Sequence, residues 1–312
     1  MNTTNAGIQR LTEPRINPFA RFYRKHPDGV RAAIILVPLL GWWFVVSGGP
    51  MFFGLLLGFF DWHNVLETPK WNGIQNFFTF FGDPNYRLTL WNSIWIGLLT
   101  AAVTNLLGLG AALLMNMPIR GRGFYRTIWY VPAVTSAAAT TQIFNMWLEP
   151  SQIGLVNNII QKFGAQPVIW QYSTGWMVFW IVFYTVWKGL GVSAILWLAG
   201  LQSVNPQLFE AAKIDGAGNW QCFRHVTIPG LRPFITFIII NACIAAIQIY
   251  EQVLFISGGG PFGSTNVLMS QIYKDAFVDF NLGMAGAGSM ILAAVVFGLV
   301  LVNWVTRDKE EE

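Results

Sequence analysis

The chain has 312 residues, of which 54% are hydrophobic and only 11% are charged. Soluble domains carry about 25% charged residues, so this composition excludes an ordinary soluble protein. A mean hydropathy of +0.47 and several long apolar runs indicate a polytopic membrane protein, and we interpret the net charge of +4 as a signal for orientation in the lipid bilayer rather than for binding nucleic acid.

The N-terminal segment, residues 1–29, is polar and basic. It lacks the apolar centre of a signal peptide, so we expect no cleavage. The two cysteines show no CxxC spacing and the three histidines are scattered, which indicates neither a disulfide framework nor a metal site. We therefore expect a cytoplasmic segment at residues 1–29, a membrane domain at residues 30–306 and a cytoplasmic tail at residues 307–312.

Six apolar segments are long enough to cross a bilayer, which requires about 20 residues in a helix. The expected spans are Val30–Phe60, Leu88–Asn116, Phe124–Leu148, Thr174–Gly200, Leu231–Ile256 and Gly283–Val305. The first span exceeds the thickness of the bilayer core and is interrupted by Gly48-Gly49-Pro50, so we expect a kink or a tilt. The predicted fold class is all-α, a polytopic bundle of six transmembrane helices.

The distribution of Lys and Arg between the loops predicts the orientation of these spans. With the N-terminus in the cytoplasm, the outer loops hold only Lys70, Arg87, Lys162 and Lys274. The cytoplasmic segments hold Arg10, Arg15, Arg21, Arg24, Lys25, Arg31, Arg120, Arg122, Arg126, Lys213, Arg224, Arg232, Arg307 and Lys309. Both termini are therefore expected in the cytoplasm, as is the connection between the fourth and fifth spans.

That connection contains a short helix with clear end signals. Asn205 is a favourable N-cap, Pro206 suits the first helical position, and Gly216 and Gly218 allow a left-handed turn after Ile214. A second short helix is expected over Asn219–His225, before Pro229 and Pro233 open the fifth span. The first helix exposes Leu208, Phe209, Ala211, Ala212 and Ile214, so this apolar surface must lie on its own bundle, on the lipid interface or in a groove of a partner.

The motif in this connection resembles the EAA loop of binding-protein-dependent ABC importer permeases. Glu210-Ala211-Ala212 and Asp215-Gly216-Ala217 are followed, at the spacing of that family, by Val226, Ile228 and Pro229. Val226 and Ile228 replace the usual Ile and Leu, which are conservative changes. The resemblance covers roughly residues 30–307. It includes the turn before the third span, "NMPIRGRGFYRTIWYVP", and the fourth span with its approach to the EAA loop, "WKGLGVSAILWLAGLQSV".

The resemblance implies a coupling helix, between the fourth and fifth spans, that a cytoplasmic ATPase dimer grips. It implies a coupling surface within the EAA loop 205–229 that comprises Leu208, Phe209, Glu210, Ala211, Ala212, Asp215, Gly216 and Ala217. The implied partners are a second homologous permease, two ATPase subunits, an extracytoplasmic solute-binding protein and a carbohydrate. ATP and Mg are expected on the ATPase subunits, with no cofactor in this chain, and the location is the bacterial cytoplasmic (inner) membrane.

The stretch "GGGPFGST", Gly258–Thr265, lies in an outer loop. It resembles the GGP-x-x-x-T loop of the maltose-type sugar permeases, first permease of the pair. It lacks the lysine of a phosphate-binding P-loop, so we expect no ATP hydrolysis by this chain, and Gly258–Gly260 are expected to form a tight turn near the outer mouth.

Polar and aromatic residues within the spans are candidates for the solute path. They are Asn145, Trp180, Tyr184, Trp187, Asn241, Gln248 and Glu251. The spacing of Asn241, Gln248 and Glu251 predicts that they share one face of the fifth helix. Lys188 is a further candidate, since charges inside spans are functional by default. Polar amides also join transmembrane helices, and tryptophans also form interfacial belts, so a purely structural role stays open.

These observations favour one permease subunit of an ATP-driven importer of di- or oligosaccharides that works by alternating access. Glycerol 3-phosphate or another polyol is the alternative solute within the same family. An ion-coupled secondary transporter that uses Lys188 and Glu251 is a second alternative, and a membrane enzyme or structural subunit is a third.

Overall fold

A computed structural model describes residues 27–64, 66–117, 121–151 and 153–311. Among these residues the only sheet pairs β1 (Phe60–Asp61) with β2 (Lys70–Trp71) in antiparallel register, and nearly everything else is helical. The all-α prediction is therefore confirmed. The chain divides into two compact units, one that ends at Gly54 and one that begins at Leu55, and most of the expected cytoplasmic segment 1–29 lies outside the described residues.

The first span contains α2 (Pro27–Trp43), a π turn η1 (Phe44–Gly48) and α3 (Gly49–Leu56), which leads into the 3-10 turn η2 (Leu57–Phe59). The Gly48-Gly49-Pro50 break is thus a widened turn within a helix. Proline clashes with the carbonyl four residues before it, and here that carbonyl belongs to the π turn, where the backbone has more room. The expected irregularity is confirmed at this position.

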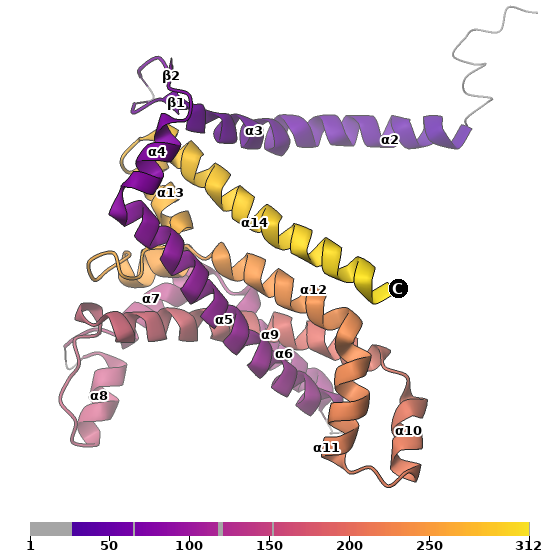
Figure 1. Cartoon of the computed structure of the whole chain (residues 1–312). Helices are drawn as coiled ribbons and strands as arrows, with labels where there is room; N and C mark the ends of the chain where they lie inside the picture. The colour runs from indigo at the N-terminus through magenta and orange to yellow at the C-terminus, as the bar shows by residue number, and fades with distance from the viewer. Residues whose placement is uncertain (1–26, 65, 118–120, 152, 312) are drawn as a thin grey trace, which may run out of the picture. The chain divides into compact units, whose positions relative to one another are not determined.

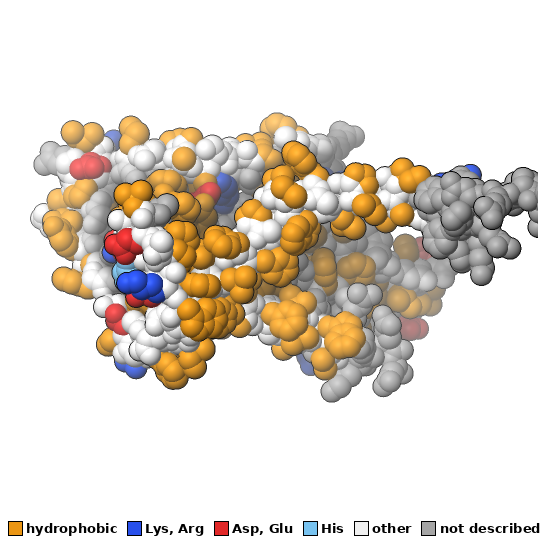
Figure 2. Space-filling model, turned by 90° about the horizontal axis from the view of Figure 1, so that it is seen from above, with side chains coloured by type: hydrophobic (Ala, Val, Ile, Leu, Met, Phe, Trp, Pro, Cys, Tyr) orange, Lys and Arg blue, Asp and Glu red, His pale blue; other side chains and the backbone are white. Residues whose placement is uncertain are grey.

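The larger unit carries the remaining helices (Figure 1). Their bounds are α4 Gln75–Gly82, α5 Pro84–Asn116, α6 Arg122–Val134, α7 Ala137–Trp147, α8 Leu155–Lys162, η3 Trp170–Tyr172, α9 Thr174–Ser203, α10 Pro206–Ile214, α11 Asn219–Cys222, η4 Phe223–Thr227, α12 Ile228–Ile247, η5 Val253–Ser257, α13 Leu268–Phe277 and α14 Leu282–Glu311. Hydrophobic side chains cover much of the surface in Figure 2, as expected for a protein solvated by lipid.

The central contact of the larger unit is the parallel pair α5 and α9. Small residues allow the two backbones to approach closely, because a Cβ at Gly108 would lie 2.2 Å from Ser193 Oγ. A buried hydrogen bond of 3.1 Å from Trp197 Nε1 to Asn105 Oδ1 joins the same two helices. This pair is the frame against which the other helices are placed.

Five helices among the described residues are long and apolar enough to cross a membrane, whereas the sequence predicts six spans. The difference is the third expected span, Phe124–Leu148, which is divided into α6 and α7 at Thr135 and Ser136. Neither half reaches the length of a span alone. The expectation of one continuous third helix is wrong: Pro132 removes a backbone donor near the break, and Lys188 of α9 donates to the carbonyl oxygen of Thr135 at the break itself.

The fifth expected span also differs from the prediction at both ends. The expected short helix Asn219–His225 is not separate, since α11, the π turn η4 and α12 form one helix from Asn219 to Ile247. Pro229 again follows two residues after a π turn, as Pro50 does in the first span. At its other end α12 stops at Ile247, and the chain is irregular until helix resumes at Glu251.

Candidate functional site

The connection between α9 and α12, which is expected in the cytoplasm, begins with α10, whose first turn is capped as the sequence predicts. The side chain of Asn205 accepts a hydrogen bond of 3.0 Å from the backbone N–H of Gln207, and Pro206 occupies the first helical position. These two residues satisfy or remove the donors that a helix start leaves unpaired. A helix of only nine residues is marginal by itself, so the cap contributes to its definition.

The end of α10 is a Schellman motif centred on Gly216. Gly216 has φ +80°, its N–H donates to Lys213 O at 3.1 Å, and the N–H of Ala217 donates to Ala212 O at 2.9 Å. No atom lies within 4 Å of a Cβ built on Gly216, so the backbone conformation rather than crowding requires glycine here. The predicted left-handed turn is confirmed.

The two sides of α10 differ in their exposure. Leu208 is 51% exposed and Ile214 is 87% exposed, and Glu210 and Ala211 are exposed with them. Phe209 instead packs on the core formed by the end of α9 and the start of α12, so the expectation of full exposure is wrong for it. The spacing of three residues from Phe209 puts Ala212, also half-buried, on the same inner side.

The returning helix completes a concave surface beside α10. A cavity of about 320 Å³ is lined by Ala212, Asp215, Gly216, Ala217, Gln221, His225 and Val226. Trp220 is 69% exposed next to it and stacks on Phe223 at 5.5 Å between ring centroids. Trp220 was not selected from the sequence, although an aromatic residue in a polar loop is the signal that would have identified it.

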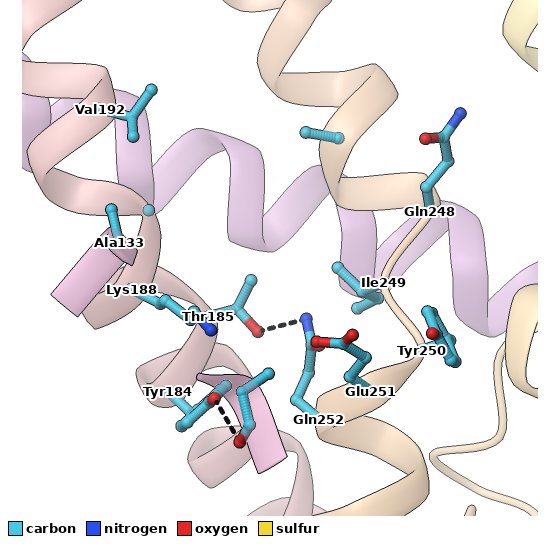
Figure 3. A pocket seen from close by; sticks show the side chains of 13 residues that line it. Ala133, Tyr184, Thr185, Lys188, Val192, Gln248, Ile249, Tyr250, Glu251 and Gln252 are labelled. Carbon is cyan, nitrogen blue, oxygen red and sulfur yellow. Dashed lines mark hydrogen bonds between the residues drawn. The ribbon is translucent and has the colours of Figure 1, made fainter. Parts of the chain in front are cut away.

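A second cavity, of about 330 Å³, lies between α9 and the irregular segment that follows α12 (Figure 3). Three predicted solute-path residues line it, namely Tyr184, Gln248 and Glu251. Lys188 lines the same cavity, so the structure brings together the two charges that the sequence placed within spans. The polar residues Thr185, Tyr250 and Gln252 complete the lining, and none of them was selected from the sequence.

Several polar groups of this central cavity are already engaged. Lys188 Nζ donates to the carbonyl oxygen of Thr135 at 3.0 Å, at the break between α6 and α7. The hydroxyl of Tyr184 is 2.7 Å from Thr140 Oγ1, and Gln252 Nε2 donates to Thr185 Oγ1 at 3.1 Å. Lys188 and Tyr184 therefore stabilise the broken third span, which gives both a structural role.

Other groups of the central cavity remain open to a ligand. Among the described residues, no hydrogen bond or ion pair reaches the carboxylate of Glu251, the amide of Gln248 or the hydroxyl of Tyr250. Gln248 and Tyr250 lie on the irregular backbone that follows α12, and Glu251 lies where helix resumes. Non-helical backbone at this depth is expected only where it is buried in protein or lines a cavity.

Four predicted solute-path residues lie outside the cavity lining. Asn145 donates from α7 to Phe255 O at 2.7 Å, and Asn241 donates to Phe237 O within α12. Trp180 packs against Trp170, and Trp187 packs against Phe144. The predicted shared helical face of Asn241, Gln248 and Glu251 is wrong, because the helix ends at Ile247 between the first and second of these residues.

The loop Gly258–Thr265, which is expected on the outer side, is a compact turn, as predicted. Gly258 and Gly259 have φ +59° and +86°, and Thr265 Oγ1 donates to Gly260 O at 2.6 Å. Asn92, on α5, donates to the carbonyl oxygens of Gly263 and Asn266 at 3.1 and 2.9 Å. The loop is therefore anchored to a transmembrane helix distant in sequence.

Comparison with known families and proteins gives a consistent match. Residues 93–310 match the family described as binding-protein-dependent transport system inner membrane component. The chain is 33% identical over 227 residues to the sulfoquinovosyl glycerol transport system permease protein SmoG of Agrobacterium fabrum, which covers 73% of this chain and 72% of that protein. It is 32% identical over 233 residues to the trehalose/maltose transport system permease protein MalF of Thermococcus litoralis, with 73% and 76% covered.

A further relative is the sn-glycerol-3-phosphate transport system permease protein UgpA of Yersinia pestis, 28% identical over 74% of this chain and 78% of that protein. Among solved structures, a bacterial ABC transporter involved in import of the acidic polysaccharide alginate has a chain that superposes with a TM-score of 0.81 at 22% identity. That match covers 93% of this chain and 99% of the other, and it supports the helix-bundle fold.

Proposed function

Because the chain belongs to the family of binding-protein-dependent transport system inner membrane components, we propose that it is one of two permease subunits of an ATP-driven carbohydrate importer. The observation that carries this proposal is α10 with its Gly216 turn, an exposed apolar helix at the position of the EAA motif. Relatives named for transport of a sulfoquinovosyl glycerol and of trehalose and maltose support a carbohydrate as the solute class.

The α10–α11 connection would be the contact with the ATPase subunits. Leu208, Ala211 and Ile214 supply exposed apolar surface, and Glu210 supplies a carboxylate without an ion pair among the described residues. Phe209 seats the helix on α9 and α12, so a push on α10 would be transmitted to two transmembrane helices as rigid-body motion. ATP and Mg would bind the ATPase subunits, with both termini of this chain in the cytoplasm.

The central cavity would be this subunit's share of the solute path. Gln248, Tyr250 and Glu251 offer an amide, a phenol and a carboxylate that are free to bond with sugar hydroxyl groups. When ATP binding brings the coupling helices together, this cavity would open outward and receive the solute from its binding protein. Release of the products of ATP hydrolysis would return the cavity to its inward-facing state.

Between the two solute classes, the charges of the central cavity favour a neutral saccharide over glycerol 3-phosphate. Its lining holds one lysine, Lys188, and one carboxylate, Glu251, so the two formal charges cancel. A phosphate monoester carries nearly two negative charges at neutral pH and requires an excess of cationic or N–H donors.

The proposal is tested by purifying the assembly in mild detergent, identifying the proteins that elute with it and reconstituting it in proteoliposomes. Uptake of sucrose, maltose, trehalose, cellobiose, raffinose and glycerol 3-phosphate is then measured with ATP inside and the binding protein outside. ATP-dependent uptake of a saccharide supports the proposal. Uptake that ceases when an ionophore collapses the ion gradient, while ATP stays high, would instead establish an ion-coupled transporter.

The role of the central cavity is tested by Glu251→Ala. We expect the solute concentration for half-maximal transport to rise by about tenfold, since a hydrogen bond to a charged group contributes about 1.5 kcal/mol. Asn241→Ala is the matched control, because Asn241 lies on the same segment of chain outside the cavity lining. Equal behaviour of the two variants would remove Glu251 from the solute path.

A further inference from the structure

A third cavity, of about 390 Å³, lies on the outer side of the larger unit, between the glycine loop and α13. Its lining combines the backbone of Gly258–Gly260 with the side chains of Asn266, Ser270, Tyr273 and Lys274. Lys274 is exposed and has no ion pair in the part of the chain that the structure describes. The cavity therefore offers an aromatic ring, an ammonium group and peptide groups to a ligand.

Aromatic rings connect this outer cavity with the central cavity. Tyr250 lines the central cavity, Tyr273 lines the outer cavity, and the centroids of their rings are 6.1 Å apart with an angle of 31° between planes. Phe277, 67% exposed at the end of α13, continues the series at 5.1 Å from Tyr273. Tyr250, Tyr273 and Phe277, here called the aromatic ladder, thus run from the outer surface to the central cavity.

The walls of the outer cavity are fixed by the chain's own hydrogen bonds. Asn266 Nδ2 donates to Gln271 Oε1 at 2.7 Å, and Ser270 Oγ donates to Asn266 Oδ1 at 2.6 Å. Thr265 Oγ1 is also 2.8 Å from Ser257 Oγ, which ties the loop to the π turn η5. A preformed cavity does not have to be ordered when a ligand binds, which favours binding.

We propose that the outer cavity is an entry subsite for a saccharide, which stacks on Tyr273 and then passes along the aromatic ladder to the central cavity. The inference rests on the proposed function and adds a site to it. Aromatic rings suit a sugar because the C–H face of a pyranose packs on the ring face while the hydroxyl groups bond to the polar rim, here Lys274 and the glycine peptide groups. Successive stacking on neighbouring rings lets each sugar unit move inward without full desolvation.

The test measures saccharide binding to the reconstituted assembly in the absence of the binding protein, by saturation-transfer NMR. The probe is whichever saccharide of the uptake panel the wild-type assembly transports. Tyr273→Ala is expected to weaken this affinity by about tenfold, because an aromatic stack is worth about 0.5–1.5 kcal/mol and 1.4 kcal/mol corresponds to tenfold. Tyr273→Phe keeps the ring and is expected to bind within about twofold of wild type.

Two further variants keep the test decisive. Phe277→Ala alters the exposed end of the aromatic ladder and is expected to weaken saccharide binding by about threefold. This variant tests the proposal even if Tyr273→Ala does not fold. Tyr172→Ala removes an outer tyrosine that is 80% exposed and lines neither cavity, so it is expected to bind as wild type does. In transport assays, Tyr273→Ala should also lower the number of saccharides moved per ATP hydrolysed.

The outcomes separate the subsite from the proposed function. Wild-type affinity and wild-type stoichiometry in both Tyr273→Ala and Phe277→Ala overturn the entry subsite while carbohydrate transport stands. Equal losses in Tyr273→Ala and Tyr172→Ala also overturn it, because the effect is then not specific to the aromatic ladder. Failure of the wild-type assembly to transport any saccharide overturns both proposals.

Discussion

The loop around Gly216, expected on the cytoplasmic side and called the cytoplasmic loop, and the loop around Gly259, expected on the outer side and called the outer loop, flank the two ends of the fifth span. Both turn on glycines with positive φ. The two loops differ in the hydrogen bonds that fix their conformations. The hydrogen bonds of the cytoplasmic turn are local, such as Ala217 N to Ala212 O, whereas the outer loop receives two bonds from Asn92, more than 170 residues away.

They differ also in exposure. The cytoplasmic loop leaves Leu208 and Ile214 largely exposed, while the outer loop places Thr265 and Val267 at 0% exposure. A loop that its own chain fixes contributes to the stability of the subunit. A loop with local bonds and exposed apolar surface is instead suited to be covered by another protein. If the proposed coupling role is correct, similar glycine turns serve folding at one end of the span and assembly at the other.

The largest effect is expected for Asn92→Ala at the outer loop. Asn92 is 2% exposed, and its removal takes a donor from the half-buried carbonyl groups of Gly263 and Asn266, of which Gly263 O keeps the N–H of Asn266 at 3.1 Å. We expect the free energy of unfolding to fall by about 2–4 kcal/mol, measured as a lower melting temperature in detergent. Asn158→Ala, at an exposed position of α8, is the control and should melt as wild type does.

The second prediction concerns the cytoplasmic turn. Gly216→Val forces a β-branched residue into a left-handed conformation at a cost of about 1–2 kcal/mol, which should weaken association with the ATPase subunits by about tenfold. Gly218→Ala is the matched control, because Gly218 has φ −73° and room for a Cβ. Co-purification measures the effect; undiminished association of Gly216→Val would contradict the proposed role of the turn.

The third prediction reverses one exposed charge on α10. Glu210→Lys should lower ATP-dependent uptake by about fivefold to tenfold and leave the melting temperature of the subunit unchanged, since a close charge pair at an interface contributes at least about 1.5 kcal/mol. Glu67→Lys places the same change on an exposed outer residue and should transport normally. A drop in melting temperature for Glu210→Lys would show that this end of the span also serves folding.

The smallest effect is expected from pH at the outer end. Burial raises the pKa of Asp275 from its ordinary value of 3.8 to about 6, and the nearby charge of Asp279 raises it further. Hydrogen bonds from Gln271 and Tyr86 and the charge of Lys274 lower the pKa and oppose this shift. The folded state therefore keeps this proton over a pH range in which the unfolded chain has lost it. Stability from this group is present below pH 4 and is lost as pH rises through 6.

Lowering the pH from 7 to 5 should accordingly raise the melting temperature by a few degrees through this group. Asp275→Asn, which carries no ionisable group, should reduce that rise. The cytoplasmic loop, in contrast, should show no change in ATPase association that depends on Asp275. An identical pH profile in wild type and Asp275→Asn would contradict the raised pKa.

The sequence predicted the helical class, the position of α10 and its two end signals correctly, because caps and glycine turns depend on residues within one or two helical turns. It also selected Tyr184, Gln248 and Glu251, which do line one cavity. It failed where helices break. Apolar residues continue through Thr135 and Ile249, and Pro132 by itself does not distinguish a kink from an interruption. Contacts with distant helices accompany both interruptions, since Lys188 of α9 donates to Thr135 O and Ile249 packs with Ile96 of α5.

What the sequence alone determined is that the chain crosses a membrane several times and presents a short, capped apolar helix after its fourth span. The length of the apolar segments, the uneven distribution of Lys and Arg between the loops, and the residues of the helix caps and turns are sufficient for these two conclusions. The tertiary structure decided which polar groups meet. Lys188 and Glu251 come to one cavity, and Asn92 reaches the outer loop, because the backbone departs from helix at points where distant side chains replace the missing hydrogen bonds.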